Sequence, residues 1–364
     1  MRINLLLLFF GLFLLSCSCS KEEDIPQSDP PVVVPEANDD YIRGMDLSDY
    51  PKIMKSNPTF KDQNGVTKPF LQILKEAGVN TVRVRLWVNP ADEHSSFEEV
   101  KTYTKELKDL GFKVWLCIHY SDWWADPQKQ HKPASWENTE YEQLKDSVYH
   151  YTLKAVSEIN PYMVQIGNEI NHGFLWPTGN ISNKANLIDL LNEGIKAVRN
   201  YNSDIKIMMH YAGYDGAEWF FNQLNSLDYD MIGLSYYPKW HGKSLSQLIN
   251  TLENLASTHH KQMVIAETSY PFTLSWNDWT NNIIGSEEQL LDDFSPSPEG
   301  QKLFIHKMRE IIEETTNGTG FCYWGAELIA HDGPQSTSGS PWENQAVFDF
   351  GNKALPVLDI YKKD

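Results

Sequence analysis

The chain has 364 residues, a formal net charge of −18 and an apolar fraction of 41%. Lys and Arg form no stripe along it, which argues against a nucleic-acid partner, and the net charge disfavours a polyanionic substrate. Aromatic residues are plentiful, with 12 Trp and 17 Tyr. Any single Trp can belong to a core, but clusters beside polar residues favour a neutral sugar, because flat rings complement the apolar faces of sugars.

Residues 1–20 have the pattern of a targeting segment. Arg2 supplies a positive end, and Leu5–Leu15 is an apolar run too short for a comfortable membrane span. The four residues Leu-Leu-Ser-Cys that end at Cys17 resemble the lipobox of bacterial lipoproteins. We therefore expect Cys17 to be lipidated and to anchor the chain in a membrane, with an ordinary cleaved signal peptide as the alternative.

The next residues predict where the chain is displayed. An acidic tract at 20–24 favours an outer-membrane lipoprotein on the cell surface, with the periplasmic face as the alternative. Residues 21–40 are rich in Pro, Asp and Glu, cannot pack a core and predict a flexible tether. The folded domain is expected to occupy residues 41–364, and a tethered monomer is the default expectation.

From residue 41 onward, short apolar runs alternate with helix-like stretches. Eight runs have the length of strands: Ile42–Leu47, Thr81–Val88, Lys113–His119, Tyr162–Gly167, Ile205–His210, Met231–Tyr236, Gln262–Ala266 and Gly320–Trp324. The helix-like stretches include Lys68–Ala77, with Pro69 in its first turn, Phe97–Leu110, Glu140–Ser157 and Lys184–Asn200. This alternation predicts an α/β fold, a single (β/α)8 TIM barrel.

Two further features fit that barrel. Ser269–Pro298 has no helix pattern and is expected to be a long loop on the active face. Cys117 and Cys322 fall in the third and eighth predicted strands, which are not neighbours in a barrel. Two buried free thiols are therefore expected rather than a disulfide, and no Cys/His spacing suggests zinc.

Two predicted strands end in a glutamate. Met163–Ile166 is followed by Gly167, Asn168 and Glu169, and Met263–Ala266 is followed by Glu267. A buried parallel strand that carries a carboxylate at its C-terminal tip is how a TIM barrel places catalytic groups. Either glutamate alone has an ordinary structural explanation, as a residue of a helix first turn or as a strand-end charge. The pair, three βα units apart, predicts the two carboxyl groups of a glycoside hydrolase.

Polar residues at other strand ends are candidates to support this pair. Arg83 and Arg85 are two positions apart and face the same side of their strand. One of them is expected to pair with the nucleophilic carboxylate and to lower its pKa, and a structural salt bridge is the alternative for each.

His119 and His210 end the third and fifth predicted strands, and each is interpreted as a pocket residue or, alternatively, as a satisfied core histidine. Tyr236 is expected to donate a hydrogen bond to Glu267, and Trp324 to form the floor of a sugar site.

Five stretches together resemble one known family. They are Gly44–Ser48, Arg83–Pro90, His119–Pro127, Gly167–Glu169 and Glu267–Pro271, and the block from His119 to Pro127 is the most specific. The sequence resembles glycoside hydrolase family 53, the arabinogalactan endo-β-1,4-galactanases, from about residue 42 to Phe350.

The resemblance implies a retaining endo-hydrolase of β-1,4-galactan, the side chain of type I arabinogalactan in pectin. It would release galacto-oligosaccharides by double displacement, with Glu169 as acid/base and Glu267 as nucleophile, and would need no cofactor for this chemistry. Asn168 would bind the sugar 2-hydroxyl. Carried over by position, the sugar subsites would be lined by Asp46, Arg83, Trp87, Asn89, His119, Asp122, Trp124, Asn168, His210, Tyr236 and Trp324.

Some bacterial members of the family hold calcium between the loops after strands seven and eight. The corresponding stretches here are Asn277–Asn282 and Ser340–Glu343, and they lack a His and an Asp of the family's pattern. Asp278, Asn282, Ser340 and Glu343 offer oxygen ligands for a structural calcium. The alternative is a polar loop held by its own hydrogen bonds.

Two other functions are alternatives for this sequence. A mannanase, xylanase or β-1,4-glucanase of the same clan would share both glutamates and differ only in the flanking motifs. A non-catalytic surface glycan-binding lipoprotein would keep aromatic platforms but lack one carboxylate, whereas this chain has both.

Overall fold

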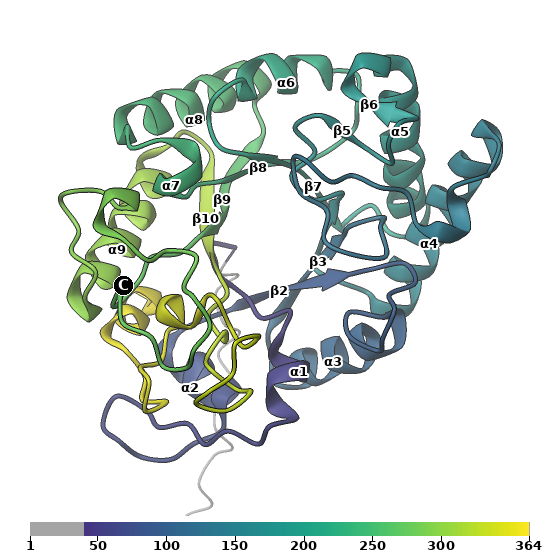
Figure 1. Cartoon of the computed structure of the whole chain (residues 1–364). Coiled ribbons are helices and arrows are strands. Elements are labelled where there is room, and N and C mark those ends of the chain that lie inside the picture. The colour runs from purple at the N-terminus through teal and green to yellow at the C-terminus, as the bar shows by residue number, and fades with distance from the viewer. Residues whose placement is uncertain (1–39, 364) are drawn as a thin grey trace, which may run out of the picture. The chain divides into compact units, whose positions relative to one another are not determined.

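A computed structural model describes residues 40–363, so the predicted targeting segment, the lipidation at Cys17 and nearly all of the tether lie outside the described residues. Eight parallel strands close a barrel in the order β1-β10-β9-β8-β7-β4-β3-β2 (Figure 1). Their bounds are Ile42–Asp46 (β1), Thr81–Leu86 (β2), Lys113–Ile118 (β3), Met163–Ile166 (β4), Lys206–Ala212 (β7), Met231–Ser235 (β8), Gln262–Thr268 (β9) and Gly318–Trp324 (β10). A small hairpin of β5 (Gly173–Phe174) and β6 (Gly179–Asn180) follows β4.

Helices surround the barrel on its outside (Figure 1). They are α1 (Tyr50–Met54), α2 (Phe70–Ala77), α3 (Phe97–Asp109), α4 (Tyr141–Ile159), α5 (Lys184–Tyr201), α6 (Ala217–Gln223), α7 (Pro238–His241), α8 (Leu245–His259) and α9 (Pro298–Glu314). Five 3₁₀ turns complete the secondary structure: η1 (Ala134–Trp136), η2 (Ile181–Asn183), η3 (Glu287–Gln289), η4 (Glu343–Gln345) and η5 (Pro356–Tyr361). Within residues 40–363, no helix is long and apolar enough to cross a bilayer.

Local sequence signals fix several helix ends. The side chain of Ser96 accepts a hydrogen bond from the Glu99 amide at the start of α3, and Ser297 does the same for the Gly300 amide at the start of α9. Helix α2 ends at Gly78, whose φ of 105° suits glycine. Pro69 is the N-cap of α2 and not, as expected, a residue of its first turn, because its ψ of 140° is not helical.

The expected barrel is confirmed, with each predicted strand present and shifted by at most two residues at either end. The four predicted helices are also confirmed, and Ser269–Pro298 is a loop with the single turn η3. The hairpin β5–β6 and the short helices α1 and α7 were not predicted, because segments of two to five residues carry too little periodicity.

Two apolar layers hold the barrel together. The interior contains Ile42, Trp115, Met163, Met208, Met231, Val264, Ala266 and Cys322, and a larger layer fills the space between strands and helices. Gly233 leaves room for this interior packing, because a Cβ there would lie 2.6 Å from the Met208 sulfur. Cys117 and Cys322 are both buried and free, which confirms the prediction of two unpaired thiols.

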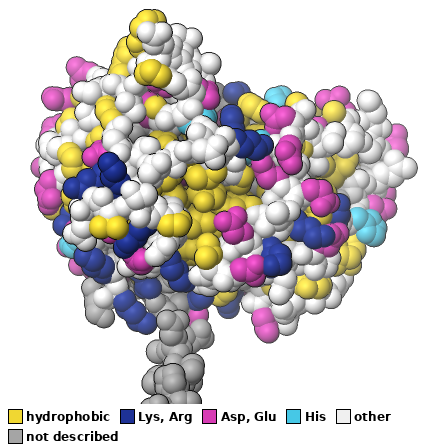
Figure 2. Space-filling model, turned by 90° about the horizontal axis from the view of Figure 1, so that it is seen from below, with side chains coloured by type: hydrophobic (Ala, Val, Ile, Leu, Met, Phe, Trp, Pro, Cys, Tyr) yellow, Lys and Arg dark blue, Asp and Glu magenta, His cyan; other side chains and the backbone are white. Residues whose placement is uncertain are grey.

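The outer surface carries a groove that is separate from the two glutamates. The groove, of about 420 Å³, is lined by residues of α1 and α3 and of the loop before α3, among them Tyr50, Met54 and Tyr103, and neither Glu169 nor Glu267 contributes to it. Figure 2 shows the side of the molecule that lies at the bottom of Figure 1, where hydrophobic side chains gather in a central hollow with acidic and basic side chains around it.

Candidate active site

The structure brings the two predicted glutamates together at the C-terminal end of the barrel. Glu169 follows β4 and Glu267 lies near the end of β9; these are the fourth and seventh barrel strands, because β5 and β6 form a separate hairpin. One carboxylate oxygen of each glutamate and a ring nitrogen of His210 all lie within 4.8 Å of one another. Glu169 has a φ of 46°, a left-handed conformation that is costly for a residue other than glycine and often marks functional sites.

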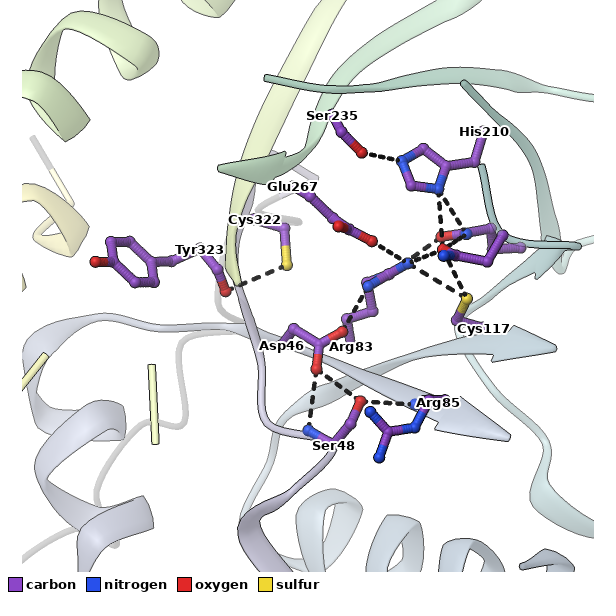
Figure 3. Close-up of polar contacts among 12 residues, drawn as sticks. Asp46, Ser48, Arg83, Arg85, Cys117, His210, Ser235, Glu267, Cys322 and Tyr323 are labelled. Carbon is purple, nitrogen blue, oxygen red and sulfur yellow. Dashed lines mark hydrogen bonds and ion pairs between the residues drawn. The ribbon is translucent and has the colours of Figure 1, made fainter. Parts of the chain in front are cut away.

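Arg83 forms the centre of the site (Figure 3). Its Nη2 lies 2.7 Å from Glu267 Oε1 and donates to Asn168 Oδ1 at 2.7 Å, and its Nη1 donates to Asp46 Oδ2 at 2.6 Å. Nη2 also lies 3.3 Å from the sulfur of Cys117. Only 2% of Arg83 is exposed. Arg83 therefore pairs with Glu267, as one of the two arginines was expected to do.

Arg85 takes the alternative role of a structural ion pair. Its Nη1 lies 3.3 Å from Asp49 Oδ2, and its Nε donates to Ser95 Oγ. The guanidinium also lies over two indole rings, 4.4 Å from the centre of Trp87 and 3.9 Å from that of Trp124. Arg85 thus supports an aromatic surface and does not contact the glutamates.

Burial and neighbouring charges give the two glutamates different proton affinities. Burial, followed by the nearby charge of Glu267, raises the pKa of Glu169 to about 8. Burial also raises the pKa of Glu267, but the Arg83 guanidinium opposes that rise. Since the two carboxyls are close, they share one proton near neutral pH, and we assign it to Glu169.

The tyrosine that reaches Glu267 is Tyr237, not Tyr236. The Tyr237 hydroxyl donates to Glu267 Oε2 at 3.2 Å. Tyr236 is fully buried, and its hydroxyl donates to the carbonyl of Gly242. The prediction failed because it placed the inward position at the last residue of the apolar run. Alternation from Met231, which faces the barrel interior, directs residues 235 and 237 inward and 236 outward.

Both strand-end histidines are buried, with His119 2% exposed. His210 is fully buried, and its ring contacts Ser235 Oγ at 2.9 Å and the Gln165 amide at 2.9 Å. Burial lowers its pKa well below the usual value, so the ring is neutral. It fits the satisfied core histidine rather than a residue that lines a sugar subsite. His119 Nδ1 accepts from the Ala125 amide.

A continuous row of aromatic rings crosses the mouth of the barrel, and we call it the aromatic belt. Neighbouring ring centres lie 4.9 to 6.2 Å apart along the series Trp123, Trp87, Trp124, Trp324, Trp342, Trp240 and Tyr237. Trp123 and Trp240 are 59% and 47% exposed. Trp87 and Tyr237 are buried within the belt, and Tyr237 bonds the nucleophile candidate, so the exposed rings are the ones that a sugar can reach.

Three of the belt rings were predicted, namely Trp87, Trp124 and Trp324. His119 lies against them, with its ring centre 6.0 Å from that of Trp124. Trp123 stands beside Trp124 in the sequence, and that adjacency was the available signal for it. Trp240 and Trp342 have no such signal, because α7 and the loop after β10 bring them in from distant parts of the chain.

The other predicted subsite residues mainly hold loops in place. Asp46 is 3% exposed, and its oxygens are used by Arg83 and Ser48, so it supports Arg83 instead of presenting a free group to a sugar. Asp122 accepts the amides of Asn89 and Ala134, each at 2.9 Å, and thereby joins two loops. Asn89 itself is exposed.

Asn168 is fixed on both sides of its amide group. Its oxygen accepts from Arg83 and from Gln165 at 3.0 Å, and its nitrogen donates to the Ala125 carbonyl at 2.9 Å. One N–H of the amide is left for a ligand by these contacts.

The residues predicted to hold calcium fit a hard cation in part. Asp278 Oδ2, Asn282 Oδ1 and Glu343 Oε2 are buried, and among residues 40–363 none of these atoms has a hydrogen-bond partner. Burial raises the pKa of Glu343, and so does the neighbouring Asp278. Unpaired carboxylate and amide oxygens are what Ca²⁺ binds. Ser340 fits less well, since its hydroxyl donates to the Leu328 carbonyl.

Comparison with known proteins agrees with this geometry. The model of glycosyl hydrolase family 53 matches residues 42–361. The chain belongs to glycosyl hydrolase family 53. It is 34% identical over 348 residues to an arabinogalactan endo-beta-1,4-galactanase of Cellvibrio japonicus, with 90% of this chain and 92% of the relative covered. An enzyme of the same name from Thermothelomyces thermophilus is 33% identical, with 88% and 98% covered.

Solved structures of the family have the same barrel. The family 53 catalytic domain of Ignisphaera aggregans superposes with a TM-score of 0.84 at 38% identity and covers 90% of this chain and 97% of its own. A structure of fungal beta-1,4-galactanases gives 0.78 at 31% identity, with 89% and 99% covered. The chain is therefore a glycoside hydrolase with a TIM-barrel fold, and enzymes of this family need no cofactor for their chemistry.

Proposed function

We propose that this family 53 enzyme is a retaining endo-hydrolase of β-1,4-galactan. One observation carries the mechanistic part, namely that oxygens of Glu169 and Glu267 lie within 4.8 Å of each other. Retaining enzymes place their two carboxyl groups about 5–5.5 Å apart, whereas inverting enzymes need about 6.5–9.5 Å to admit a water molecule. The close pair supports double displacement.

In the first step, a Glu267 oxygen attacks the anomeric carbon while protonated Glu169 gives its proton to the leaving glycosidic oxygen. The C–O bond to the leaving sugar breaks, and a glycosyl ester to Glu267 forms. Arg83 and Tyr237 hold the carboxylate of Glu267 ready for this attack. In the second step, Glu169 accepts a proton from water, whose oxygen replaces Glu267 on the anomeric carbon.

The substrate proposal combines the belt with the names of the relatives. The matched enzymes of Cellvibrio and Thermothelomyces are named arabinogalactan endo-beta-1,4-galactanases. The aromatic belt has exposed rings at Trp123 and Trp240, with half-buried rings between them, and such rings suit a chain of neutral sugars and cleavage inside a polymer. We infer that the substrate is the linear galactan side chain of type I arabinogalactan in pectin, and that galacto-oligosaccharides are the products.

The test is hydrolysis of linear β-1,4-galactan beside mannan, xylan and carboxymethylcellulose, with products separated by length. We expect short galacto-oligosaccharides from galactan alone, and their loss in Glu169→Gln. Activity only on another polymer would overturn the substrate, and no activity on any polymer would revive a glycan-binding role.

A structural calcium ion is a separate proposal. Asp278, Asn282 and Glu343 would hold it through the buried oxygens described above, and it would tie the loop after β9 to the loop after β10. We expect Tm to fall on treatment with EDTA and to recover with CaCl2, and Glu343→Gln to abolish that response. An EDTA-insensitive Tm would contradict the proposal and favour a loop held by its own hydrogen bonds.

We also propose that the enzyme is a monomeric outer-membrane lipoprotein, anchored through Cys17 and displayed on the cell surface. The lipobox-like sequence and the acidic tract after it support this. Labelling with an alkynyl fatty acid should mark the wild-type chain and not Cys17→Ala.

A further inference from the structure

Ser235 lies between the two glutamates and is not one of the groups that react in the double displacement. It ends β8, is fully buried and pairs in register with Glu267 across an irregularity between β8 and β9. Its Oγ donates to Glu169 Oε1 at 2.6 Å and lies 2.9 Å from His210 Nε2 (Figure 3 shows the contact with His210). A single buried hydroxyl thus touches the acid/base candidate from the strand next to the nucleophile.

The direction of this hydrogen-bond chain follows from the other nitrogen of His210. The backbone N–H of Glu169 points at His210 Nδ1 at 3.3 Å, and the Gln165 amide nitrogen lies 2.9 Å from the same atom. Asn168 Oδ1 lies 3.2 Å from Nδ1 as well, but this oxygen already accepts from Arg83 and Gln165. Since a backbone N–H can only donate, two donors face Nδ1, so Nδ1 accepts and the ring proton is on Nε2. Nε2–H then donates to Ser235 Oγ, whose own proton is free to point at Glu169 Oε1.

We propose that Ser235 is a positioning residue which, oriented by His210, reserves Glu169 Oε1 as an acceptor and so places the acid proton of Glu169 on Oε2. Among residues 40–363, no hydrogen bond or ion pair engages Oε2. Oε2 is therefore the oxygen that can deliver a proton to the glycosidic oxygen. This inference rests on the proposed function, in which Glu169 is the acid/base.

The backbone of Glu169 is held as firmly as its side chain. Gln130, 1% exposed, donates from its amide nitrogen to the carbonyls of Asn168 at 2.7 Å and Glu169 at 3.3 Å. These bonds stabilise the left-handed backbone at Glu169, which aims its carboxyl at Ser235. Both ends of the residue are thus constrained, as transfer of a proton in one direction requires.

Several groups face the Glu169 carboxyl and set its response to pH. Glu267 on β9 and Asp126 in the loop after β3 raise its pKa, whereas the Ser235 hydrogen bond and the Arg83 charge lower it. His210 is neutral. Loss of the Ser235 hydroxyl should therefore raise the pKa of Glu169. Because the protonated acid is the active form, the alkaline limb of the pH profile should move to higher pH.

The experiment compares Ser235→Ala with Ser235→Thr, which keeps a hydroxyl, in the full chain. The control is Thr315→Val, which also removes one buried hydroxyl. Thr315 follows α9 at the opposite end of the barrel, and its hydroxyl donates to the Ile311 carbonyl. For each protein, kcat/KM is measured against pH on linear β-1,4-galactan and on dinitrophenyl β-galactobioside, whose leaving group needs no protonation. Thermal unfolding checks that each variant is folded.

For Ser235→Ala we expect a fall in kcat/KM on galactan of about 10-fold, the loss of one hydrogen bond from a hydroxyl to the protonated acid. We also expect the alkaline limb of the pH profile to lie at higher pH and kcat/KM on the activated substrate to fall much less. Ser235→Thr should recover the wild-type kcat/KM and pH profile. An unmoved limb with equal losses on both substrates would overturn the inference and make Ser235 merely structural. Wild-type activity on a different polymer would overturn only the proposed substrate. The role of Ser235 would then be tested by the same pH profiles measured on that polymer.

Discussion

The tips of β4 and β9 each present a glutamate, yet they surround it differently. Glu267 is held at both oxygens, by Arg83 at 2.7 Å and by Tyr237 at 3.2 Å. Glu169 is held at one oxygen by the neutral hydroxyl of Ser235, and it is the residue whose pKa reaches about 8. Arg83 opposes the rise that burial causes in the pKa of Glu267, whereas burial and the charge of Glu267 together raise the pKa of Glu169, so we assign the shared proton to Glu169. The neighbours, not the residue type, divide the roles of nucleophile and acid.

Replacing each glutamate in turn is the strongest way to break this comparison. Glu267→Gln should lower kcat on every substrate by on the order of 10⁴-fold or more, since a neutral amide is a far weaker nucleophile than a carboxylate. Glu169→Gln should lower kcat/KM on galactan by roughly 10²- to 10⁴-fold but spare dinitrophenyl β-galactobioside, which needs no acid. Steady-state kinetics on both substrates checks this, and equal losses in the two variants would refute the division of roles.

Arg83 is the charge that sets the two tips apart. Arg83→Lys cannot contact Asp46, Asn168 and Glu267 together, so kcat/KM should fall by roughly 100-fold. The pKa of Glu267 should rise, and because the nucleophile must be ionised, the acidic limb of the pH profile should move to higher pH. At least one buried acceptor loses its partner, so unfolding in urea should show a loss of about 1–3 kcal/mol.

Arg199→Lys is the matched control for that variant. Arg199 also contacts two carboxylates, Asp228 and Asp230, but on the outside of the barrel. Its substitution should leave the pH profile unchanged, and a shift of the acidic limb here would show that the effect of Arg83→Lys is not local.

Two adjacent tyrosines sharpen the picture at Glu267. Tyr237→Phe removes the hydroxyl that bonds the nucleophile, and kcat should fall by roughly 10-fold. Tyr236→Phe removes a hydroxyl that bonds the Gly242 carbonyl and should leave kcat within about 2-fold, with at most a small loss of Tm. The reverse order of effects would mean that the register at the end of β8 is wrong.

The smallest effect is expected at the far end of the aromatic belt. Trp123→Ala should raise KM for galactan by about 5- to 10-fold with little change in kcat, because stacking there binds substrate and transition state alike. Trp219 on α6 is equally exposed, at 59%, and lies outside the belt. Trp219→Ala should therefore leave KM unchanged, and equal effects of the two would remove the belt from substrate binding.

Much of the fold and the centre of the site could be predicted from the sequence. Buried parallel strands are almost continuously apolar, so strands such as Met163–Ile166 stand out, and a glutamate at such a tip is conspicuous. Side chains alternate between the two faces of a strand, so Arg83 and Arg85 were expected on the same face of β2, with one of them paired to Glu267.

The remainder depends on contacts that spacing does not encode. Ser235 is important because His210 on β7 and Glu169 after β4 both contact its hydroxyl. Gln130 is important because its side chain binds the backbone that follows β4. Neither residue type signals such a role by itself. Counting every second residue from Met231 leads to Tyr237, one residue beyond the predicted strand. The prediction took the last residue of that strand, Tyr236, instead.

The most direct test of the account is the anomeric configuration of the first product. Linear β-1,4-galactan is cleaved by the wild-type enzyme in an NMR tube, and the anomeric proton signals are followed before mutarotation equilibrates them. Double displacement predicts that the β-anomer appears first, because formation of a glycosyl ester to Glu267 inverts the configuration and attack by water inverts it again. Initial release of the α-anomer would mean a single displacement, and Glu267 could not then be the nucleophile.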